Sequence, residues 1–274
     1  MKGQITMYDI LIIGSGPAGL SAAITARARG KSVAVISNSA SESGLYRAPV
    51  IDNYPGLPGV SGAELSDRLV SHALDMGAEL IPGRVTSVLP SKNGMSVSYG
   101  SEFASGGALI LALGATASSV FPGESELLGR GVSYCATCDG MLYRGKSVVV
   151  VSLAPDAPAE AEHLRSIGCR VTELRSENIE ILGDTKAEAI VADGEKIPCD
   201  GVFVLRKIIA PTSLLPGIEL LDGYIKTDAA LATSVRGVFA AGDCTGGARQ
   251  IAKAVGEGQT AAFSAIAYME RGGA

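Results

Sequence analysis

The sequence is poor in the residues and patterns that mark several classes of protein. It has no tryptophan and only two histidines among 274 residues, and aromatic side chains make up 5%. Basic residues number 23 against 28 acidic ones and form no basic block, so nucleic acid is not an expected partner. The longest apolar runs, such as GALILALGA and KSVVVVSLA, have the length of strands and fall short of the roughly 20 residues that span a bilayer.

The N-terminal end leaves no room for a signal peptide, because an apolar strand is expected from Tyr8 onward. We therefore predict a soluble, cytoplasmic protein without a membrane span. Cysteine is scarce as well, with five residues, and in a reducing compartment two closely spaced cysteines are more often catalytic or metal-binding than structural. The length of the chain suits one large domain or two smaller ones.

Glycine, in contrast, is abundant, with 35 residues, and the N-terminal segment arranges three of them as a nucleotide-binding turn. Residues 10–13 form a short apolar run typical of a buried parallel strand, and Gly14, Gly16 and Gly19 follow as G-x-G-x-x-G. The first glycine permits the tight turn, the second lets the backbone approach a pyrophosphate, and the third lets the next helix pack on the strand. Residues 33–36 complete a βαβ unit, which is the context that a dinucleotide site requires.

The acidic residue that usually binds a ribose at the end of the second strand is missing from this fingerprint. Ser37 and Asn38 stand there instead, so the ribose contact is expected from elsewhere, although both remain candidates for the cofactor site. The candidates at this end of the chain are Gly14, Ser15, Gly16, Pro17, Ala18, Gly19, Ser37 and Asn38.

A second candidate cofactor contact lies near the C-terminus, in GVFAAGDCTGGARQIAKAVGEGQTAA. A strand is expected to end at Gly242 and Asp243, where the carboxylate can accept a hydrogen bond from a sugar-like hydroxyl. A long helix is expected to begin near Arg249, Gln250 and Ile251, and its free N–H groups could stabilise negative charge on a bound ring system.

Taken in order, GSGPAG, NYPG, LALGA, CATCDG and GVFAAGD followed by RQ resemble the motifs of the low-molecular-weight thioredoxin reductases. The resemblance implies an α/β fold of two Rossmann-like, three-layer domains. Residues 1–115 and 209–274 would form a discontinuous FAD-binding domain, and residues 116–208 a shortened insert that carries the cysteine pair. It also implies a homodimer, a thioredoxin-like partner and bound FAD. In the FAD site it places the pyrophosphate on residues 14–19, the ribityl chain on Asp243, and these residues near the flavin: Asn53, Gly114, Arg249, Gln250 and Ile251.

The cysteine pair in GVSYCATCDG has three candidate uses. A zinc site would need further ligands with paired spacing, and the remaining candidates are isolated from one another: Cys169, Cys199, Cys244, His72 and His163. A structural disulfide that closes so small a ring would stabilise the fold very little. We therefore predict no metal, a redox-active pair of Cys135 and Cys138, and buried roles for the other three cysteines.

The resemblance assigns a role to each member of this motif. It places Cys138 against the flavin, where it forms the flavin-thiolate adduct, and makes Cys135 the outer thiol that attacks the disulfide of the partner. Asp139 is placed to move protons to or from the departing thiolate. An alternative for Asp139 is the N-cap of the next segment.

The middle of the chain departs from the family pattern. Residues 147–151, 157–167 and 170–174 have the rhythm of a second strand–helix–strand unit, but the turn reads SLAPDA and contains no glycine. Its side chains would fill the space that a pyrophosphate needs, Pro155 lacks an N–H donor, and Asp156 adds negative charge. The basic cluster that would hold a 2′-phosphate is replaced by LRSENIEI. We therefore predict that NADPH does not bind in the usual way.

Relatives that lack the NADPH motifs point to two other electron donors. The chain resembles ferredoxin-dependent flavin thioredoxin reductases and diflavin-linked disulfide oxidoreductases, and ferredoxin is slightly favoured over a second flavin. An acidic ferredoxin would want a basic patch, for which Arg206 and Lys207 are candidates. A second flavin would want an aromatic platform, for which Tyr46, Tyr134 and Tyr143 are candidates. Ordinary solvated or core roles are favoured for all five side chains.

The leading prediction is an FAD enzyme that passes electrons through Cys135 and Cys138 to a thioredoxin-like protein. The first alternative is a dithiol oxidase, which would pass electrons from a small dithiol to oxygen. The second is a non-catalytic flavin-binding protein, and the intact cysteine pair beside Asp139 argues against it.

Overall fold

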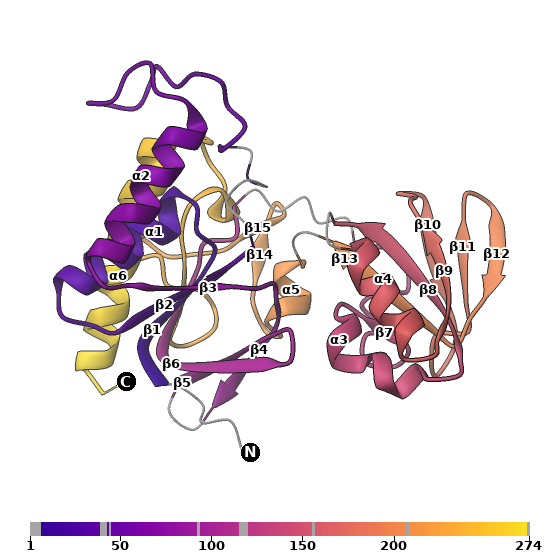
Figure 1. The fold of residues 1–274 in the computed structure, drawn as a ribbon. Helices are drawn as coiled ribbons and strands as arrows, with labels where there is room; N and C mark the ends of the chain where they lie inside the picture. The colour runs from indigo at the N-terminus through magenta and orange to yellow at the C-terminus, as the bar shows by residue number, and fades with distance from the viewer. Residues whose placement is uncertain are drawn as a thin grey trace. The chain divides into compact units, whose positions relative to one another are not determined.

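The computed structural model describes residues 7–38, 43, 45–91, 94–114, 120–154, 157–206 and 209–272, apart from the side chain of Cys138. The chain divides into two compact units, unit 1 (Met1–Thr116 and Leu214–Ala274) and unit 2 (Ala117–Ser213). Both units have a parallel sheet at their centre, which confirms the predicted α/β fold class (Figure 1). The cofactor roles predicted for residues 1–115, 116–208 and 209–274 stay predictions.

Unit 1 contains most of the longer helices and strands of the described chain. Its elements are β1 (Met7–Ile13), α1 (Pro17–Ala28), β2 (Val33–Ser37), α2 (Gly62–Asp75), β3 (Glu79–Pro82), β4 (Val85–Ser91), β5 (Gly94–Tyr99), β6 (Glu102–Leu111), β14 (Leu220–Leu221), β15 (Tyr224–Ile225), β16 (Val238–Ala240), the 3₁₀ turn η3 (Asp243–Thr245) and α6 (Ile251–Glu270). The short helix α5 (Pro211–Leu214) lies at the border of the two units.

The main sheet of unit 1 has the order β3-β2-β1-β6-β5-β4, and β16 also pairs with β6. Strands β3, β2, β1, β6 and β16 are parallel, whereas β5 and β4 are antiparallel additions. In the register, Ile13 lies beside Ile36 and Leu111, and Leu111 lies beside Ala240. The residues that follow β1, β2, β6 and β16 therefore meet at one edge of the sheet.

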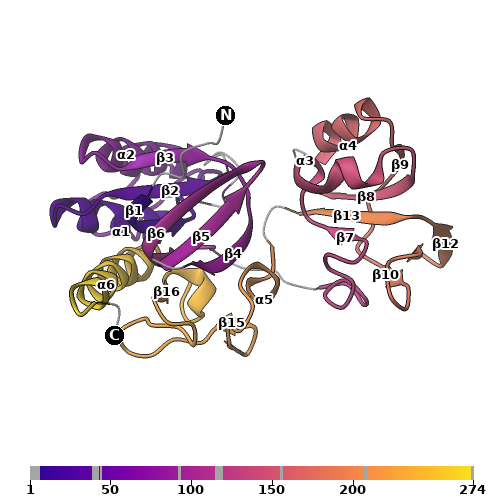
Figure 2. The same cartoon turned by 90° about the horizontal axis from the view of Figure 1, so that it is seen from below.

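Helices α1 and α6 pack against each other and against this sheet (Figure 2). Pro17 begins α1, where a missing N–H costs nothing, and the buried face of the helix consists mainly of alanines. A Cβ on Gly258 of α6 would lie 2.0 Å from the carbonyl oxygen of Ala18, so only glycine permits this close helix contact. The contact fixes the beginning of α1 against α6, next to the edge at which the strands end.

Unit 2 is built around a smaller parallel sheet with the order β7-β13-β8-β9 and a separate antiparallel sheet with the order β10-β11-β12. Its elements are β7 (Val132–Ser133), α3 (Ala136–Asp139), the 3₁₀ helix η2 (Gly140–Tyr143), β8 (Ser147–Leu153), α4 (Ala157–Ser166), β9 (Arg170–Leu174), β10 (Ile179–Leu182), β11 (Ala189–Ala192), β12 (Glu195–Pro198) and β13 (Gly201–Arg206). The predicted strand–helix–strand unit is thus confirmed as β8, α4 and β9.

No helix in the described part of the chain is long and apolar enough to cross a membrane.

Candidate active site

The carboxyl edge of the unit 1 sheet gathers the cofactor residues predicted from both ends of the sequence. The glycine turn follows β1, Ser37 ends β2, Gly114 follows β6, and Asp243 follows β16. Parallel strands place their carboxyl ends at the same edge, which is where open α/β sheets bind ligands. The geometry therefore brings together residues that are more than 200 positions apart.

The turn after β1 fits the predicted phosphate cradle. Gly14 has a φ of +108°, and a Cβ there would lie 2.1 Å from the carbonyl oxygen of Ala112. A Cβ on Gly19 would lie 1.9 Å from the carbonyl oxygen of Gly14, so both positions exclude any side chain. At Gly16, in contrast, no atom of the described residues lies within 4 Å of a Cβ position, and none of their side chains caps the N-terminus of α1. The turn leaves open space in front of a helix N-terminus, which is what a pyrophosphate needs.

The two residues that replace the usual ribose-binding acid are linked to the glycine turn. The hydroxyl of Ser15 donates a 2.8 Å hydrogen bond to Oγ of Ser37, which donates in turn to the carbonyl oxygen of Asn38 at 2.9 Å. Both side chains that meet here are uncharged, so the end of β2 supplies no carboxylate for a ribose.

A charged pair on α6 fixes the loop that carries Asp243, and the sequence analysis missed it. Oε2 of Glu257 accepts hydrogen bonds from the backbone N–H of Gly242 at 2.7 Å and from the hydroxyl of Thr245 at 3.1 Å. Lys253 donates from Nζ to the same carboxylate oxygen and to the carbonyl oxygen of Gly242, both at 3.1 Å. The spacing of four residues between Lys253 and Glu257 on the helix was the available signal.

Two further predicted residues meet at the start of α6. Nδ2 of Asn53 donates a 2.9 Å hydrogen bond to Oε1 of Gln250, and both side chains are exposed. Arg249 is exposed as well, and α6 begins at Ile251, as expected. At Gly114 no atom of the described part of the chain lies within 4 Å of a Cβ position.

In unit 2, the cysteine motif forms the short helix α3. Cys135 is buried and disulfide-bonded, whereas the side chain of Cys138 is outside the described part of the structure. The hydroxyl of Ser133 accepts a hydrogen bond from the backbone N–H of Cys135 at 3.1 Å and donates to Oδ2 of Asp139 at 2.7 Å. Asp139 precedes η2 but makes no capping hydrogen bond, so the alternative N-cap role is wrong. The Ser133 hydroxyl instead links the carboxylate of Asp139 to the backbone of Cys135.

A second carboxylate, which the sequence analysis missed, reaches this helix from α4. Oε2 of Glu160 accepts a 2.8 Å hydrogen bond from the backbone N–H of Ala136, the first residue of α3. Glu160 is half-buried and Ala136 is fully buried. The two residues are 24 positions apart, and only the packing of α3 on α4 reveals their contact.

The turn between β8 and α4 differs from the glycine turn of unit 1. Ser152 lies near the end of β8, Ala154 lies in the turn and Ala157 begins α4; all three are buried, and Oγ of Ser152 has no hydrogen-bond partner among the described residues. Pro155 and Asp156 lie outside the described residues. Methyl and hydroxymethyl groups therefore occupy the end of β8, the turn and the start of α4, where a pyrophosphate would need glycines.

The end of β9 does not form a basic cluster either. Arg175, the one basic residue of LRSENIEI, is exposed. Just before it, Glu173 accepts a 2.6 Å hydrogen bond from Arg165 of α4.

The structure corrects the expectation that Arg206 belongs to a basic patch or a solvated strand end. Its guanidinium is buried and forms a bidentate ion pair with Glu124, with distances of 2.9 Å and 2.8 Å. It also lies 4.8 Å from the ring centroid of Phe121. Glu124 is fully buried and accepts a 2.8 Å hydrogen bond from the hydroxyl of Tyr134. Arg206 therefore serves the core of unit 2, and Lys207 lies outside the described residues.

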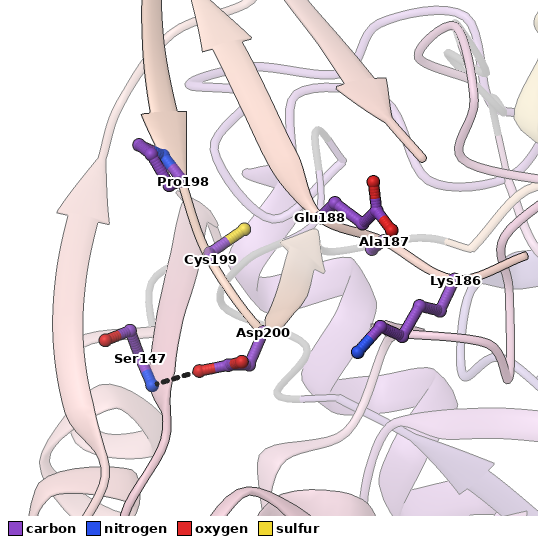
Figure 3. A pocket seen from close by; sticks show the side chains of 7 residues that line it. All are labelled: Ser147, Lys186, Ala187, Glu188, Pro198, Cys199 and Asp200. Atoms are coloured by element: carbon purple, nitrogen blue, oxygen red, sulfur yellow. Dashed lines mark hydrogen bonds between the residues drawn. The ribbon is translucent and has the colours of Figure 1, made fainter. Parts of the chain in front are cut away.

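The three isolated cysteines are buried free thiols, as predicted: Cys169, Cys199 and Cys244. Burial raises the pKa of Cys199 and of Cys244 to about 11 and also raises the pKa of Cys169, so all three are neutral at physiological pH. A pocket of about 340 Å³ contains Cys199 (Figure 3) and is lined by Ser147, Lys186, Ala187, Glu188, Pro198, Cys199 and Asp200. It lies where β8 begins, whereas the α4 turn follows the other end of β8, so it is not a nucleotide cradle.

A dinucleotide-type turn in one α/β unit and a redox-type cysteine pair in another define the two-domain disulfide oxidoreductases. The family model for the pyridine nucleotide-disulphide oxidoreductases matches residues 8–178 and 166–258, and the chain belongs to this family. Within it, the resemblance to the low-molecular-weight thioredoxin reductases is confirmed, and the protein is a thioredoxin reductase-like oxidoreductase.

Individual relatives cover almost the whole chain. The sequence is 34% identical over 301 residues to the thioredoxin reductase of Treponema pallidum, covering 97% of this chain and 98% of the relative. It is 31% identical over 307 residues to the thioredoxin reductase of Listeria monocytogenes, covering 98% and 96%. The crystal structure of a ferredoxin-flavin thioredoxin reductase from Clostridium acetobutylicum matches with a TM-score of 0.87 at 36% identity, covering 97% of this chain and 99% of that one.

Proposed function

We propose that the protein is an FAD-dependent disulfide reductase that receives electrons from a donor other than NADPH, with ferredoxin as the preferred donor. A thioredoxin-like protein is the proposed acceptor. The observation that carries this proposal is the contrast between two turns of the same strand–turn–helix kind. In unit 1, Gly14 and Gly19 leave no room for side chains and Gly16 borders open space. In unit 2, Ala154 is buried in the turn and Ala157 is buried at the first position of α4.

The residues of unit 1 fit FAD. The glycine turn would hold its pyrophosphate, Asp243 would accept from the ribityl chain, and the start of α6 would lie near the ring. FAD supplies a carrier that exchanges electrons with both one-electron and two-electron partners. The proposed contacts are the residues predicted from the sequence: Gly14, Ser15, Gly16, Pro17, Ala18, Gly19, Ser37, Asn38, Asn53, Gly114, Gly242, Asp243, Arg249, Gln250 and Ile251.

The cysteine pair carries the electrons onward. Reduction of the pair takes two electrons and two protons and yields two thiols. Deprotonated Cys135 then attacks the disulfide of the acceptor, and Cys138 attacks the resulting mixed disulfide, so that the pair is re-oxidised and the acceptor leaves as a dithiol. Asp139, whose carboxylate accepts a hydrogen bond from Ser133, is the proposed group that exchanges the proton of a departing or attacking sulfur.

Two observations favour ferredoxin over a second flavin. Tyr134 is buried with its hydroxyl bound to Glu124, and the Tyr143 ring packs edge-on against Phe203 with 5.3 Å between centroids, which favours core roles for both and leaves Tyr46 as the candidate platform. The Clostridium acetobutylicum relative is itself a ferredoxin-flavin thioredoxin reductase. A homodimer remains part of the proposal through the family resemblance.

Turnover of a thioredoxin-like disulfide under anaerobic conditions tests the proposal. The flavin-loaded protein should reduce the disulfide with reduced ferredoxin and fail to do so with NADPH. Cys138→Ser should retain FAD and lose turnover with either donor. NADPH-driven turnover at the ferredoxin rate would contradict the proposed donor, whereas fast peroxide formation from a small dithiol in air would favour a dithiol oxidase.

A further inference from the structure

We propose that Glu160 is a positioning residue of the cysteine pair, which holds Cys135 as a neutral thiol in the reduced protein by binding the first N–H of α3. The proposal rests on the proposed function only in that the pair must alternate between disulfide and dithiol. In this proposal α4 positions the cysteine pair, although the turn that precedes α4 lacks the glycines of a dinucleotide cradle.

The contacts around Cys135 fix its backbone on both sides. Its own N–H donates to Oγ of Ser133 at 3.1 Å, and the N–H of the next residue, Ala136, donates to Oε2 of Glu160 at 2.8 Å. The carboxylate of Glu160 thus binds the N–H of the peptide bond that directly follows Cys135, the residue that bears the thiol. Cys135 is 4% exposed and Ala136 is fully buried, so water does not replace either contact in this conformation.

The hydrogen bond from Ala136 to Glu160 disfavours ionisation of the Cys135 thiol in two ways. In Cys-x-x-Cys motifs, N–H groups at the start of the helix stabilise the thiolate and lower the thiol pKa. Here Glu160 takes up one of those donors. Its negative charge then disfavours a second negative charge on a neighbouring sulfur, and the burial of Cys135 acts in the same direction.

The other titratable groups near α3 and η2 include a strong base, because Nζ of Lys146 lies 5.5 Å from the ring centroid of Tyr143. Asp139 belongs to α3 itself, and its charge contributes to a raised pKa of Tyr143 in η2, although burial is the larger cause there. His163 lies one turn beyond Glu160 on α4. Glu160 is distinguished from these groups by its hydrogen bond to the backbone of the cysteine helix.

We expect Glu160 to slow the reactions of the reduced cysteine pair with reagents other than its partner. A thiol whose pKa is kept high reacts slowly with oxidants and alkylating agents that are not its partner, because the thiolate is the nucleophile. Displacement of Glu160 from the N–H of Ala136 would raise the reactivity of Cys135. The carboxylate therefore links the packing of α4 to the nucleophilicity of the thiol.

The pH dependence of Cys135 alkylation in the full-length, flavin-loaded protein tests this inference. A Cys138→Ser background removes the disulfide and the coupled second thiol, and peptide mapping distinguishes Cys135 from Cys169, Cys199 and Cys244. In that background, Glu160→Gln keeps an acceptor oxygen but removes the charge. The midpoint of the alkylation profile should fall by about half a pH unit or more. The midpoint reports ionisation, whereas accessibility changes only the limiting rate.

The control is Glu162→Gln, which neutralises an exposed carboxylate on the same helix and should leave the midpoint unchanged. A midpoint in Glu160→Gln at or above that of the parent would overturn the proposal. If Glu160→Gln does not fold, Glu160→Asp serves instead: its shorter side chain withdraws the charge from Ala136, and an unchanged midpoint would overturn the proposal equally. The assay needs neither an electron donor nor a protein partner, so its failure is distinct from failure of the proposed function.

Discussion

Asn53 and Gln250 lie 197 positions apart, yet Nδ2 of Asn53 donates a 2.9 Å hydrogen bond to Oε1 of Gln250. The contact joins the NYPG motif, which precedes α2, to the RQ motif at the start of α6. Two segments that were assigned to the same cofactor only by resemblance thus meet within unit 1. Their proximity supports the proposed FAD site without identifying the bound molecule.

We expect Asn53→Ala to weaken FAD binding while leaving the fold intact. The side chain is exposed, so loss of its hydrogen bond should hardly change thermal stability, whereas loss of a flavin contact should raise the Kd of FAD about three- to tenfold. Titration of the apoprotein with FAD measures this Kd. The matched control is Asn178→Ala, an exposed asparagine of unit 2. Equal affinities in the two variants would remove Asn53 from the site.

Glu257→Gln should loosen the loop that carries Asp243. The variant removes the charge that accepts from Gly242 and Lys253, and such charge-assisted hydrogen bonds contribute about 1–3 kcal/mol. We expect a lower melting temperature and faster release of FAD on dilution. Glu219→Gln, which breaks an exposed ion pair with Lys226, should change neither quantity. Identical FAD release in both variants would show that Glu257 does not support the site.

The buried pair of Glu124 and Arg206 should be sensitive to removal of one partner. Arg206→Met leaves the Glu124 carboxylate buried without its counter-charge, and we expect a loss of about 3–5 kcal/mol in the free energy of unfolding. The double variant Glu124→Gln/Arg206→Met should be more stable than Arg206→Met. Urea denaturation measures both, and Arg68→Ala, which breaks the exposed pair with Glu64, serves as a control with little effect. A double variant less stable than either single one would contradict the buried-pair account.

The buried thiol of Cys244 should make the protein less stable at alkaline pH. Burial raises its pKa from 9.0 to about 11, so the folded state keeps a proton that the unfolded chain releases in this range. The contribution is fully present below about pH 9 and is lost as the pH rises through about 11, with a size on the order of 2 kcal/mol.

Cys244→Ala removes this titration and should therefore lose less stability than the wild type between pH 8 and pH 10.5. The comparison concerns the slope against pH, because the lost methylene and sulfur contacts lower stability at every pH. Unfolding free energies at matched pH values provide the measurement. Parallel slopes for the two proteins would show that Cys244 does not titrate differently in the folded state.

The local features of the fold could be predicted from the sequence. The glycine turn of residues 14–19, the strand–helix–strand rhythm of unit 2 and the start of α6 at Ile251 all depend on short patterns of apolar residues, glycine and proline. The burial of the three isolated cysteines was equally accessible, since cysteine without a partner is usually a small core residue.

The interactions between distant segments could not be predicted in this way. In the sequence, Arg206 ends a strand and resembles a solvated basic residue. Its ion pair with Glu124, which lies 82 positions earlier, is visible only in the folded structure. The contact between Glu160 and Ala136 likewise depends on how α4 packs on α3. Hydrogen-bond partners of this kind follow from tertiary packing, on which sequence spacing alone carries no information.

An anaerobic titration of the flavin-loaded protein decides whether NADPH is its electron donor. Reduced ferredoxin should bleach the visible absorbance of the flavin, while a stoichiometric amount of NADPH should leave the spectrum unchanged. Rapid, stoichiometric bleaching by NADPH would contradict the account and would show that the glycine-free turn of unit 2 still admits the nucleotide.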